Sequence, residues 1–277
     1  MIVGCIGDVH GRACHALAVL AKWQTLRGRK FDLVVQVGDL GVLPDPATGE
    51  RPYDRFSEWD IAVYDLYELV KATGEDAKLL GEFGQEIASP IHVVPGNHDA
   101  FAQFFETREA NERCPVPIDP HGLFHCVPDG YTVRCDDAVV GFCAGGDPQR
   151  LGQDYSGPLD LFVSHEGGFG EAAGEDLPEG PEPVIRYLKS NKPLFHVFGH
   201  FHHPAGPIKV HETRCVQLAS VVSNPRHPTL QVINEGCIGA LDTETGDFEF
   251  VEGDWLGAYG RQGGFPLLAE TLREIRP

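Results

Sequence analysis

Short apolar runs recur along the chain, and most of them end abruptly at glycine, proline or a polar residue. Runs of this kind, bounded by turn-forming residues, are typical of buried β-strands. On this basis we expect strands over residues 2–6, 31–37, 91–94, 123–127, 131–134, 138–143, 159–163, 194–198, 210–220, 229–233, 238–241 and 248–251.

Helical periodicity occupies several of the intervals between these runs. Residues 13–23 and 55–73 each carry an apolar stripe at helical spacing. A strand, a helix and a strand over residues 2–37 predict a right-handed parallel unit, in which the carboxyl ends of the two strands are neighbours. From Gly122 onward, short strands joined by tight turns predict a second, partly antiparallel sheet. Further helices are expected over residues 100–111, 184–189 and 266–273.

Composition narrows the class of protein. The chain has 277 residues, 42% of them hydrophobic and 23% charged, which is ordinary for a globular protein of one large domain or two small ones. Its 41 acidic and 22 basic residues give a formal charge of −19, and such a surface repels nucleic acid and anionic membranes. The eight cysteines are scattered, and the start of the chain lacks a basic, secretory-type segment. These features predict a cytoplasmic protein with reduced thiols and no membrane partner.

Five of the apolar runs end in residues that can bind a metal ion. A single histidine at a strand end is usually structural. Five strand ends that place polar side chains beside the core would carry a large desolvation cost, which a structural role alone does not explain. Neutral imidazoles, carboxylates and an amide oxygen suit divalent Mn, Fe or Zn. They outnumber the ligands of one tetrahedral ion, so we predict two ions that share a carboxylate. The residues are Asp8, His10, Asp39, Asn97, His98, His165, His200 and His202.

The order and spelling of these motifs resemble a known family, the calcineurin-like metallophosphoesterases. Any one motif is weak evidence, but the five together, in sequence, are strong, and the resemblance extends from residue 1 to about residue 210. The five motifs are Gly7-Asp8-Val9-His10-Gly11, Gly38-Asp39, Gly96-Asn97-His98-Asp99, Ser164-His165 and Gly199-His200-Phe201-His202.

The resemblance implies both a fold and a chemistry. The fold is an α/β, four-layer αββα sandwich of two mixed β-sheets flanked by helices. The chemistry is hydrolysis of a phosphate monoester or diester, in a small phosphoester or a nucleotide, by hydroxide that two divalent metal ions generate. The implied roles are Asp8, His10 and His202 on one metal, Asn97, His165 and His200 on the other, Asp39 between the two, and catalytic His98 oriented by Asp99.

Departures from the family pattern leave the substrate open. Gly38-Asp39-Leu40-Gly41 lacks the Asp-Arg pair of the phosphoprotein phosphatases, so protein phosphatase activity is not expected. The long interval before Asn97 is similar to that of RNA lariat-debranching phosphodiesterases, yet the first motif keeps Asp-x-His and no basic groove for RNA is evident. A non-catalytic scaffold of the same fold is a further alternative, although such scaffolds typically lose ligands that this chain retains.

The domain organisation follows from the extent of the motifs. We expect a phosphoesterase domain over residues 1–252 and a C-terminal tail over residues 253–277, with its helix packed on the outside. Residues 44–90 form either a cap over the strand ends or a cover for the outer face of the sheet, and an acidic, glycine-rich loop follows over residues 166–183. The candidate phosphate contacts are Arg12, Arg51 and Arg55.

Overall fold

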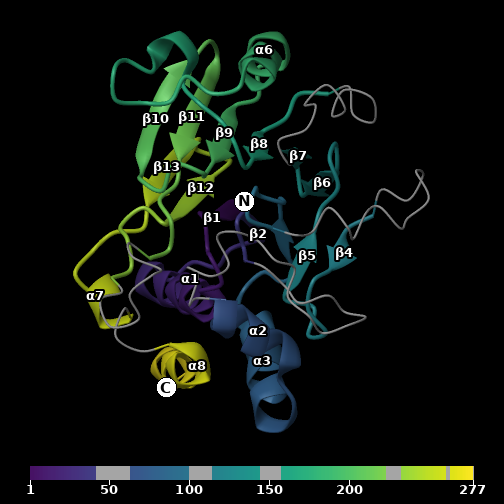
Figure 1. Cartoon of the computed structure of the whole chain (residues 1–277), viewed down its shortest axis with the longest axis vertical. Helices are drawn as coiled ribbons and strands as arrows, with labels where there is room; N and C mark the ends of the chain where they lie inside the picture. The colour runs from purple at the N-terminus through teal and green to yellow at the C-terminus, as the bar shows by residue number, and fades with distance from the viewer. Residues whose placement is uncertain (42–62, 100–113, 144–156, 223–231, 260–262, 277) are drawn as a thin grey trace.

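In a computed structural model, the chain folds into two β-sheets packed face to face, with helices on both outer faces. Figure 1 shows the four layers stacked from helix α6 at the top to helices α3 and α8 at the bottom. The αββα sandwich that the sequence predicts is therefore confirmed. The structure describes residues 1–41, 63–99, 114–143, 157–222, 232–259 and 263–276.

The first sheet has a parallel centre and antiparallel edges. Strands β1, β2, β3 and β5 run parallel, whereas β12 pairs antiparallel with β1, β13 with β12, and β4 with β5. The parallel pairing of β1 with β2 places the carboxyl ends of these strands side by side, as the sequence predicts. In spatial order the strands are β13 (Asp247–Phe250), β12 (Ile238–Asp242), β1 (Ile2–Ile6), β2 (Leu33–Gln36), β3 (Ile91–Val93), β5 (Phe124–Cys126) and β4 (Val116–Pro117).

The second sheet repeats this plan. Its central strands β11, β9, β8 and β7 are parallel, and β10 and β6 are antiparallel edges. Buried valines, leucines and phenylalanines from both sheets meet in the core between them. In spatial order the strands are β10 (Ala205–Val210), β11 (Thr213–Gln217), β9 (Phe195–Phe198), β8 (Leu161–Ser164), β7 (Ala138–Cys143) and β6 (Thr132–Cys135).

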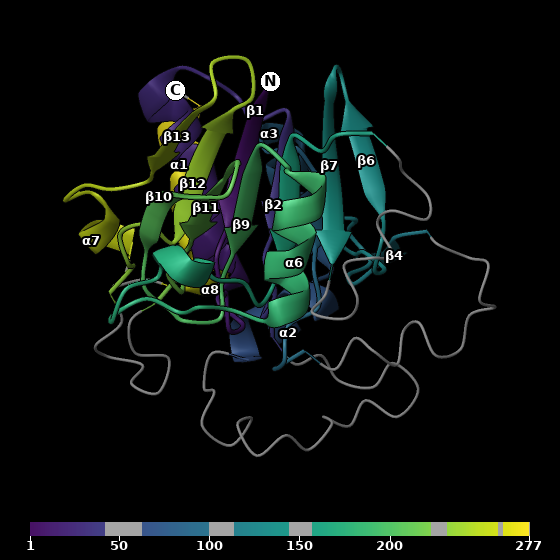
Figure 2. The same cartoon turned by 90° about the horizontal axis from the view of Figure 1, so that it is seen from above.

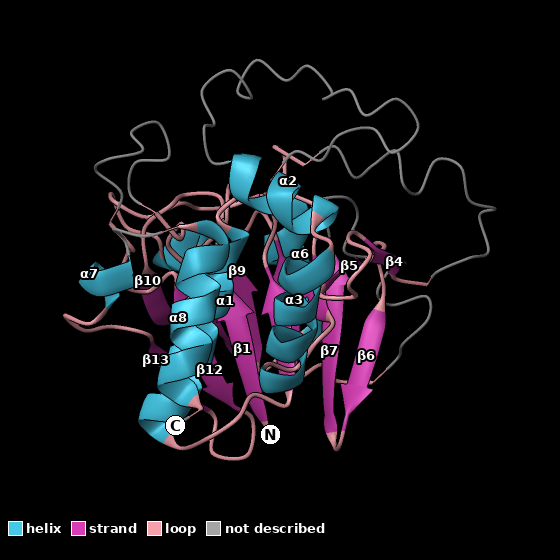
Figure 3. Ribbon diagram, turned by 90° about the horizontal axis from the view of Figure 1, so that it is seen from below, coloured by secondary structure: helices cyan, strands magenta, loops and turns pink. Residues whose placement is uncertain are grey.

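Helices cover both outer faces. Figure 3 shows α1, α2, α3 and α8 over the first sheet, where their apolar side chains form a second core. The second sheet is covered by α6 and the short 3₁₀ helix η2, which bury a third core. None of the described helices combines the length and hydropathy that a membrane crossing needs. The helices are α1 (Ala13–Arg27), α2 (Val63–Lys71), α3 (Gly74–Glu86), η2 (Gly170–Ala172), α6 (Glu182–Asn191), α7 (Leu256–Tyr259) and α8 (Gly264–Ile275).

Several elements differ from the sequence expectation. The strand expected over residues 210–220 is shorter in the structure. Strand β11 covers only Thr213–Gln217, and Val210 is the last residue of β10, because the chain reverses at His211, whose φ is 55°. Strand β10 was missed since it is a half-exposed edge that contains Pro207 and lacks an apolar run. Strand β4 and helices α3, α7 and η2 were also not predicted. The helix expected over residues 100–111 lies outside the described residues, and so do most of the 229–233 strand and the first part of the 55–73 helix.

The described part of the 44–90 segment packs on the outer face of the first sheet. Leu66 of α2 and Phe83 of α3 are fully buried in the core that these helices share with α1 and α8. The backbone N–H of Leu66 donates to the carbonyl of Gly11, 3.0 Å away, so α2 begins beside the first motif. Residues 44–62, on which a cap would depend, lie outside the described residues. The tail helix α8 lies against α1 and buries Leu268 in the same core.

Stability should depend on pH through a buried histidine of β3. Burial, and secondarily the proximity of His125, lowers the pKa of His92 from 6.5 to about 4. Between these values the unfolded chain binds a proton that the folded chain does not. Each pH unit below 6.5 should therefore cost about 1.4 kcal/mol of unfolding free energy, down to about pH 4. Urea unfolding of the metal-free protein at several pH values measures this slope.

A substitution isolates the contribution of His92. Its ring is stacked near Tyr131 and Phe142, with centroids 6.2 and 5.8 Å away, so phenylalanine suits the site. We expect His92→Phe to reduce the slope by about 1.4 kcal/mol per pH unit. The exposed His211→Asn serves as a control, because asparagine tolerates the positive φ of that turn. A wild-type slope in His92→Phe would show that His92 does not carry the effect.

Candidate metal centre

The loops after β1, β2, β3, β8 and β9 meet at one end of the sandwich. Open α/β sheets place their sites at the carboxyl ends of strands, and here both sheets contribute. Each loop carries one of the motifs found in the sequence. Asp8 and His10 follow β1, Asp39 follows β2, Asn97, His98 and Asp99 follow β3, His165 follows β8, and His200 and His202 follow β9.

The first group of ligand atoms comes from Asp8, His10, Asp39 and His202. One ligand atom from each residue lies within 4.8 Å of all the others. Nε2 of His202 is 3.0 Å from Nε2 of His10 and 3.1 Å from Oδ2 of Asp8. Asp8, His10 and Asp39 are buried and His202 is exposed, so the group opens to solvent on the His202 side.

The second group is formed by Asn97, His165 and His200. Oδ1 of Asn97 is 2.7 Å from Nε2 of His165 and 3.0 Å from Nδ1 of His200. The two ring nitrogens are 3.3 Å apart. Three atoms that can each donate an electron pair to a metal thus lie close together, and they come from three different loops.

Asp39 stands between the two groups. Its Oδ2 is 3.9 Å from Nε2 of His10 in the first group and 3.5 Å from Nε2 of His165 in the second. Nε2 of His98 lies 4.0 Å from the same oxygen. One carboxylate oxygen therefore faces both groups and the imidazole of His98.

Four of these residues adopt a left-handed backbone. The φ angles are 46° at His10, 55° at Asp39, 72° at His200 and 64° at His202. This conformation is uncommon for residues other than glycine and costs of order 1 kcal/mol or more at each position. Hydrogen bonds between the loops hold it: the N–H of His10 donates to the carbonyl of Asp39, and that of His200 to the carboxylate of Asp8.

The protonation states suit metal binding. Burial lowers the pKa of His10 to about 4 and also lowers the pKa of His200, so both rings are neutral at pH 7. Nδ1 of His165 donates to the carbonyl of Val37, 3.0 Å away, which leaves the lone pair of Nε2 facing the cluster. Burial opposes ionisation of Asp8, but its hydrogen bond to His202 and the nearby histidines lower its pKa overall.

The donor set fits divalent cations. Unprotonated ring nitrogens, an amide oxygen and carboxylates crowd together at distances where their lone pairs repel one another, and a cation relieves that repulsion. Imidazole with carboxylate is the combination that Mn, Fe and Zn accept. The hydrogen bond from His202 to Asp8 raises the pKa of His202, so a proton competes for that nitrogen when no metal is bound.

His98 and Asp99 support the loops in different ways. The backbone N–H of His98 donates to Oδ1 of Asp39 (2.8 Å), and its ring meets the ring of His10 edge-on with centroids 5.4 Å apart. The carboxylate of Asp99 accepts N–H groups from Gly41 (2.9 Å), Gly96 (2.9 Å) and Leu40 (3.3 Å), and so joins the turns after β2 and β3. Burial, followed by the charge of Asp39, raises the pKa of Asp99 to about 7. Sequence reasoning did not anticipate these backbone bonds.

Glycines allow the loops to approach the carboxylates. A Cβ atom would lie 2.0 Å from Oδ1 of Asp8 if placed on Gly199, and 2.2 Å from Oδ1 of Asp39 if placed on Gly96. Real Cβ atoms do not tolerate such contacts, so the carboxylates would have to move. The glycines of the motifs therefore have a steric role at the ligands as well as ending the strands.

We expect Gly96→Ala to weaken metal binding about 10- to 100-fold, the range seen when groups that orient ligands are changed. The reason is displacement of Asp39 by the new methyl group. Competition with a chelator measures the affinity. Gly81→Ala in α3 is the matched control, since its methyl group would meet no atom within 4 Å and should stabilise the helix by about 1 kcal/mol. Equal metal affinity in the two variants would contradict the steric role.

The candidate arginines are only partly described. Arg12 lines a cavity of about 370 Å³ between α2 and the start of α8, together with Glu68, Lys71, Asp76 and Phe265. Its assignment as a phosphate contact stays a prediction. Arg51 and Arg55 lie outside the described residues.

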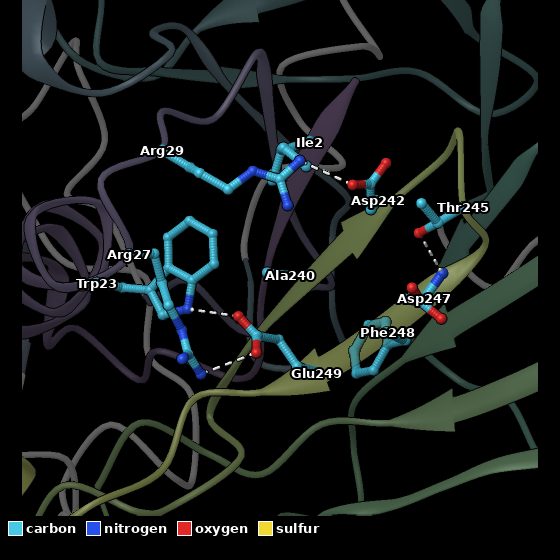
Figure 4. Close-up of a pocket in the computed structure, with 10 residues that line it drawn as sticks. All are labelled: Ile2, Trp23, Arg27, Arg29, Ala240, Asp242, Thr245, Asp247, Phe248 and Glu249. Carbon is cyan, nitrogen blue, oxygen red and sulfur yellow. Dashed lines mark hydrogen bonds and ion pairs between the residues drawn. The ribbon is translucent and has the colours of Figure 1, made fainter.

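A cavity of about 350 Å³ lies at the other end of the first sheet (Figure 4). Four of its charged groups are paired: Arg29 binds Asp242 at 2.7 Å, and Glu249 accepts from Arg27 at 2.8 Å and from the indole of Trp23 at 3.1 Å. Asp242 pairs with Ile2, at the opposite end of β1 from Asp8. The metal-ligand groups and this cavity are therefore separated by the length of β1.

A comparison with protein families supplies the decisive observation. The family model of the calcineurin-like phosphoesterases matches residues 1–204, which is most of the chain. The chain belongs to the calcineurin-like phosphoesterases. This family consists generally of metal-dependent hydrolases, and the Asp/His group of this member is a candidate metal site. Family membership and site together support a metallophosphoesterase. A sequence comparison with curated proteins found no match.

The solved structure of one protein shows the same fold. The calcineurin-like chain resembles TT1561 of Thermus thermophilus with a TM-score of 0.50 and 14% identity, over 91% of this chain and 98% of that one. Calcineurin-like phosphoesterase YfkN from Bacillus subtilis gives a TM-score of 0.41 and 13% identity, over 99% and 96% of the two chains. The likeness to TT1561 supports the shared fold.

Proposed function

We propose that the protein is a dinuclear metal-dependent phosphoesterase that hydrolyses a small phosphate ester or a nucleotide. The observation that supports it best is the position of Asp39, whose Oδ2 faces His10 in one ligand group and His165 in the other. A carboxylate shared in this way can bridge two cations. Asp8, His10 and His202 would hold one ion, Asn97, His165 and His200 the other, and Asp39 both.

The chemistry divides between the cations and the chain. When bound, two divalent cations neutralise phosphate oxygens and make a water nucleophilic at neutral pH. The chain supplies two buried carboxylates, Asp8 and Asp39, and the imidazole of His98 beside Asp39. His98 would hold a proton at a ring nitrogen and deliver it to the leaving oxygen, which is the role of a general acid.

The substrate class follows from charge. With 41 acidic and 22 basic residues, the protein repels long polyanions, so small phosphoesters or nucleotides suit it better than RNA or DNA. We propose that the substrate is either a phosphate monoester or a phosphate diester. Hydrolysis of nitrophenyl phosphate and of bis-nitrophenyl phosphate separates the two activities directly.

Metal analysis with these substrates tests the proposal. We expect about two ions of Mn, Fe or Zn per chain, loss of hydrolysis on chelation, and recovery when metal is restored. Hydrolysis that persists after complete metal removal, or saturation at one ion per chain, would contradict it. Two bound ions without hydrolysis of any ester would favour the non-catalytic scaffold instead.

A further inference from the structure

Gln36 is a polar residue at the end of an otherwise apolar strand. It follows Leu33, Val34 and Val35 in β2, and its side chain has no exposed surface. A buried amide is costly unless its donors and acceptor are satisfied. The hydrogen bonds of Gln36 therefore show what the residue does.

The side chain of Gln36 binds the two glycines that precede the carboxylate ligands. Nε2 donates to the carbonyl of Gly7 (3.1 Å) and to the carbonyl of Gly38, and Oε1 accepts the N–H of Gly38 (3.0 Å). Both amide hydrogens and the acceptor oxygen are thereby used. Since Asp8 follows Gly7 and Asp39 follows Gly38, one side chain joins the turns that carry both carboxylates.

Backbone hydrogen bonds join the same two turns beyond the ligands. The N–H groups of Val9 and His10 donate to the carbonyl of Asp39 at 3.0 and 2.8 Å, and that of Gly11 donates to the carbonyl of Leu40 at 2.7 Å. Gln36 supplies the connection on the strand side. Hydrogen bonds therefore hold each turn on both sides of its carboxylate residue, Asp8 or Asp39.

The turn at Gly38 also contacts the second ligand group. Gly38 has a φ of 107°, and a Cβ atom there would lie 2.5 Å from Nδ1 of His165. Gln36 binds both backbone polar groups of Gly38, so it holds this left-handed turn against the His165 ring. The carbonyl of Val37, between Gln36 and Gly38, accepts from the same ring nitrogen.

We infer that Gln36 is a positioning residue of the metal centre. Through Gly7 and Gly38 it sets the separation of Asp8 and Asp39 and the approach of His165, without itself contacting a metal or a substrate. The inference rests on the proposed function, because it concerns the geometry of the same ligands. A buried glutamine that merely stabilised the fold would affect unfolding and leave metal affinity unchanged.

Gln36→Met is the principal test, since methionine has a similar volume and removes all of these hydrogen bonds. We expect the affinity for Mn²⁺ to fall about 10- to 100-fold, as for other groups that orient ligands. We also expect the electron paramagnetic resonance spectrum of the Mn²⁺-loaded protein to lose the signature of a spin-coupled pair. Turnover should fall with little change in KM.

Gln24→Met is the matched control. Gln24 is also buried, donates to the carbonyl of Glu86 (2.7 Å) and accepts the N–H of Phe31 (2.8 Å), but it joins α1 to segments away from the ligand loops. This variant should lose stability and keep the wild-type Mn²⁺ affinity and spectrum. Wild-type affinity and spectrum in Gln36→Met as well would overturn the inference.

A second variant covers the case in which Gln36→Met does not fold. Gln36→Glu keeps the length of the side chain and the acceptor for the Gly38 N–H, but places an oxygen against the carbonyl of Gly7. It should bind Mn²⁺ more weakly than wild type, and unchanged affinity would overturn the inference. A wild-type protein that binds only one Mn²⁺ would refute the dinuclear function separately. The Gln36 variants would still report on that ion, because Asp8 and Asp39 share the first group.

Discussion

Asp39→Ala is expected to lose bound metal and, with it, roughly three decades or more of phosphoester hydrolysis. The carboxylate faces both ligand groups, at 3.9 Å from His10 and 3.5 Å from His165, so its removal weakens both ion positions at once. Metal ions contribute several kcal/mol of stabilisation to charge that develops in the transition state, which sets the size of the loss. Elemental analysis and nitrophenyl ester hydrolysis measure the two effects.

Two control variants distinguish a specific loss of metal binding from general destabilisation of the fold. Asp39→Asn keeps the shape of the side chain and one oxygen, so it should fold like wild type while holding metal less tightly. Asp242→Ala removes an acidic residue at the opposite end of β1, where it pairs with Arg29, and should keep the full metal content. Full occupancy of both positions in Asp39→Ala would refute the bridging role.

His98→Ala is expected to keep both metal ions and the fold, and to lose about two to four decades of turnover on substrates with poor leaving groups. The backbone N–H of His98, which donates to Asp39, is retained in this variant, so the carboxylate keeps its support. Esters with good leaving groups need less proton donation, so nitrophenyl substrates should suffer less. Rates for a series of esters with leaving groups of graded pKa measure this dependence.

The dependence of the rate loss on the pKa of the leaving group distinguishes between two roles for His98. A loss that grows as the leaving group becomes more basic identifies an acid. An equal loss for all leaving groups would exclude proton donation and indicate that His98 stabilises charge on the phosphate. His211→Asn, on the exposed β10–β11 turn, should show wild-type rates throughout.

The sequence by itself was sufficient for the fold class, the family and the location of the candidate site. Buried parallel strands appear in the sequence as short apolar runs. Polar residues directly after such runs lie beside the core, and their desolvation cost indicates that they have a function there. The motif of Asp8 and His10 directly follows such a run, as does that of Asp39. Parallel pairing of the strands then places these residues together, because carboxyl ends of parallel strands share one edge. The metal-ligand roles of the individual residues stay predictions.

Other features required the tertiary structure. Periodicity shows that a helix has an apolar face but does not show which surface covers it, so the position of α2 and α3 on the outer face of the first sheet could not be predicted. Strand β10 escaped detection because a half-exposed edge lacks the apolar run of a buried strand. Gln36, the polar residue of β2, could be recognised in the sequence, but its hydrogen-bond partners Gly7 and Gly38 could not.

The same reason applies to the details of the site. Gln36 bonds to Gly7, Asp99 to Gly41, and Asp39 faces His165, and each pair is separated by tens of residues or more along the chain. Such contacts arise only when the strands pair and the two sheets pack, and they depend on turns with positive φ whose geometry local sequence does not specify. Local pattern therefore determined which strand ends carry ligand residues. Pairing of the strands and packing of the two sheets determined which atoms meet and which side chains hold them.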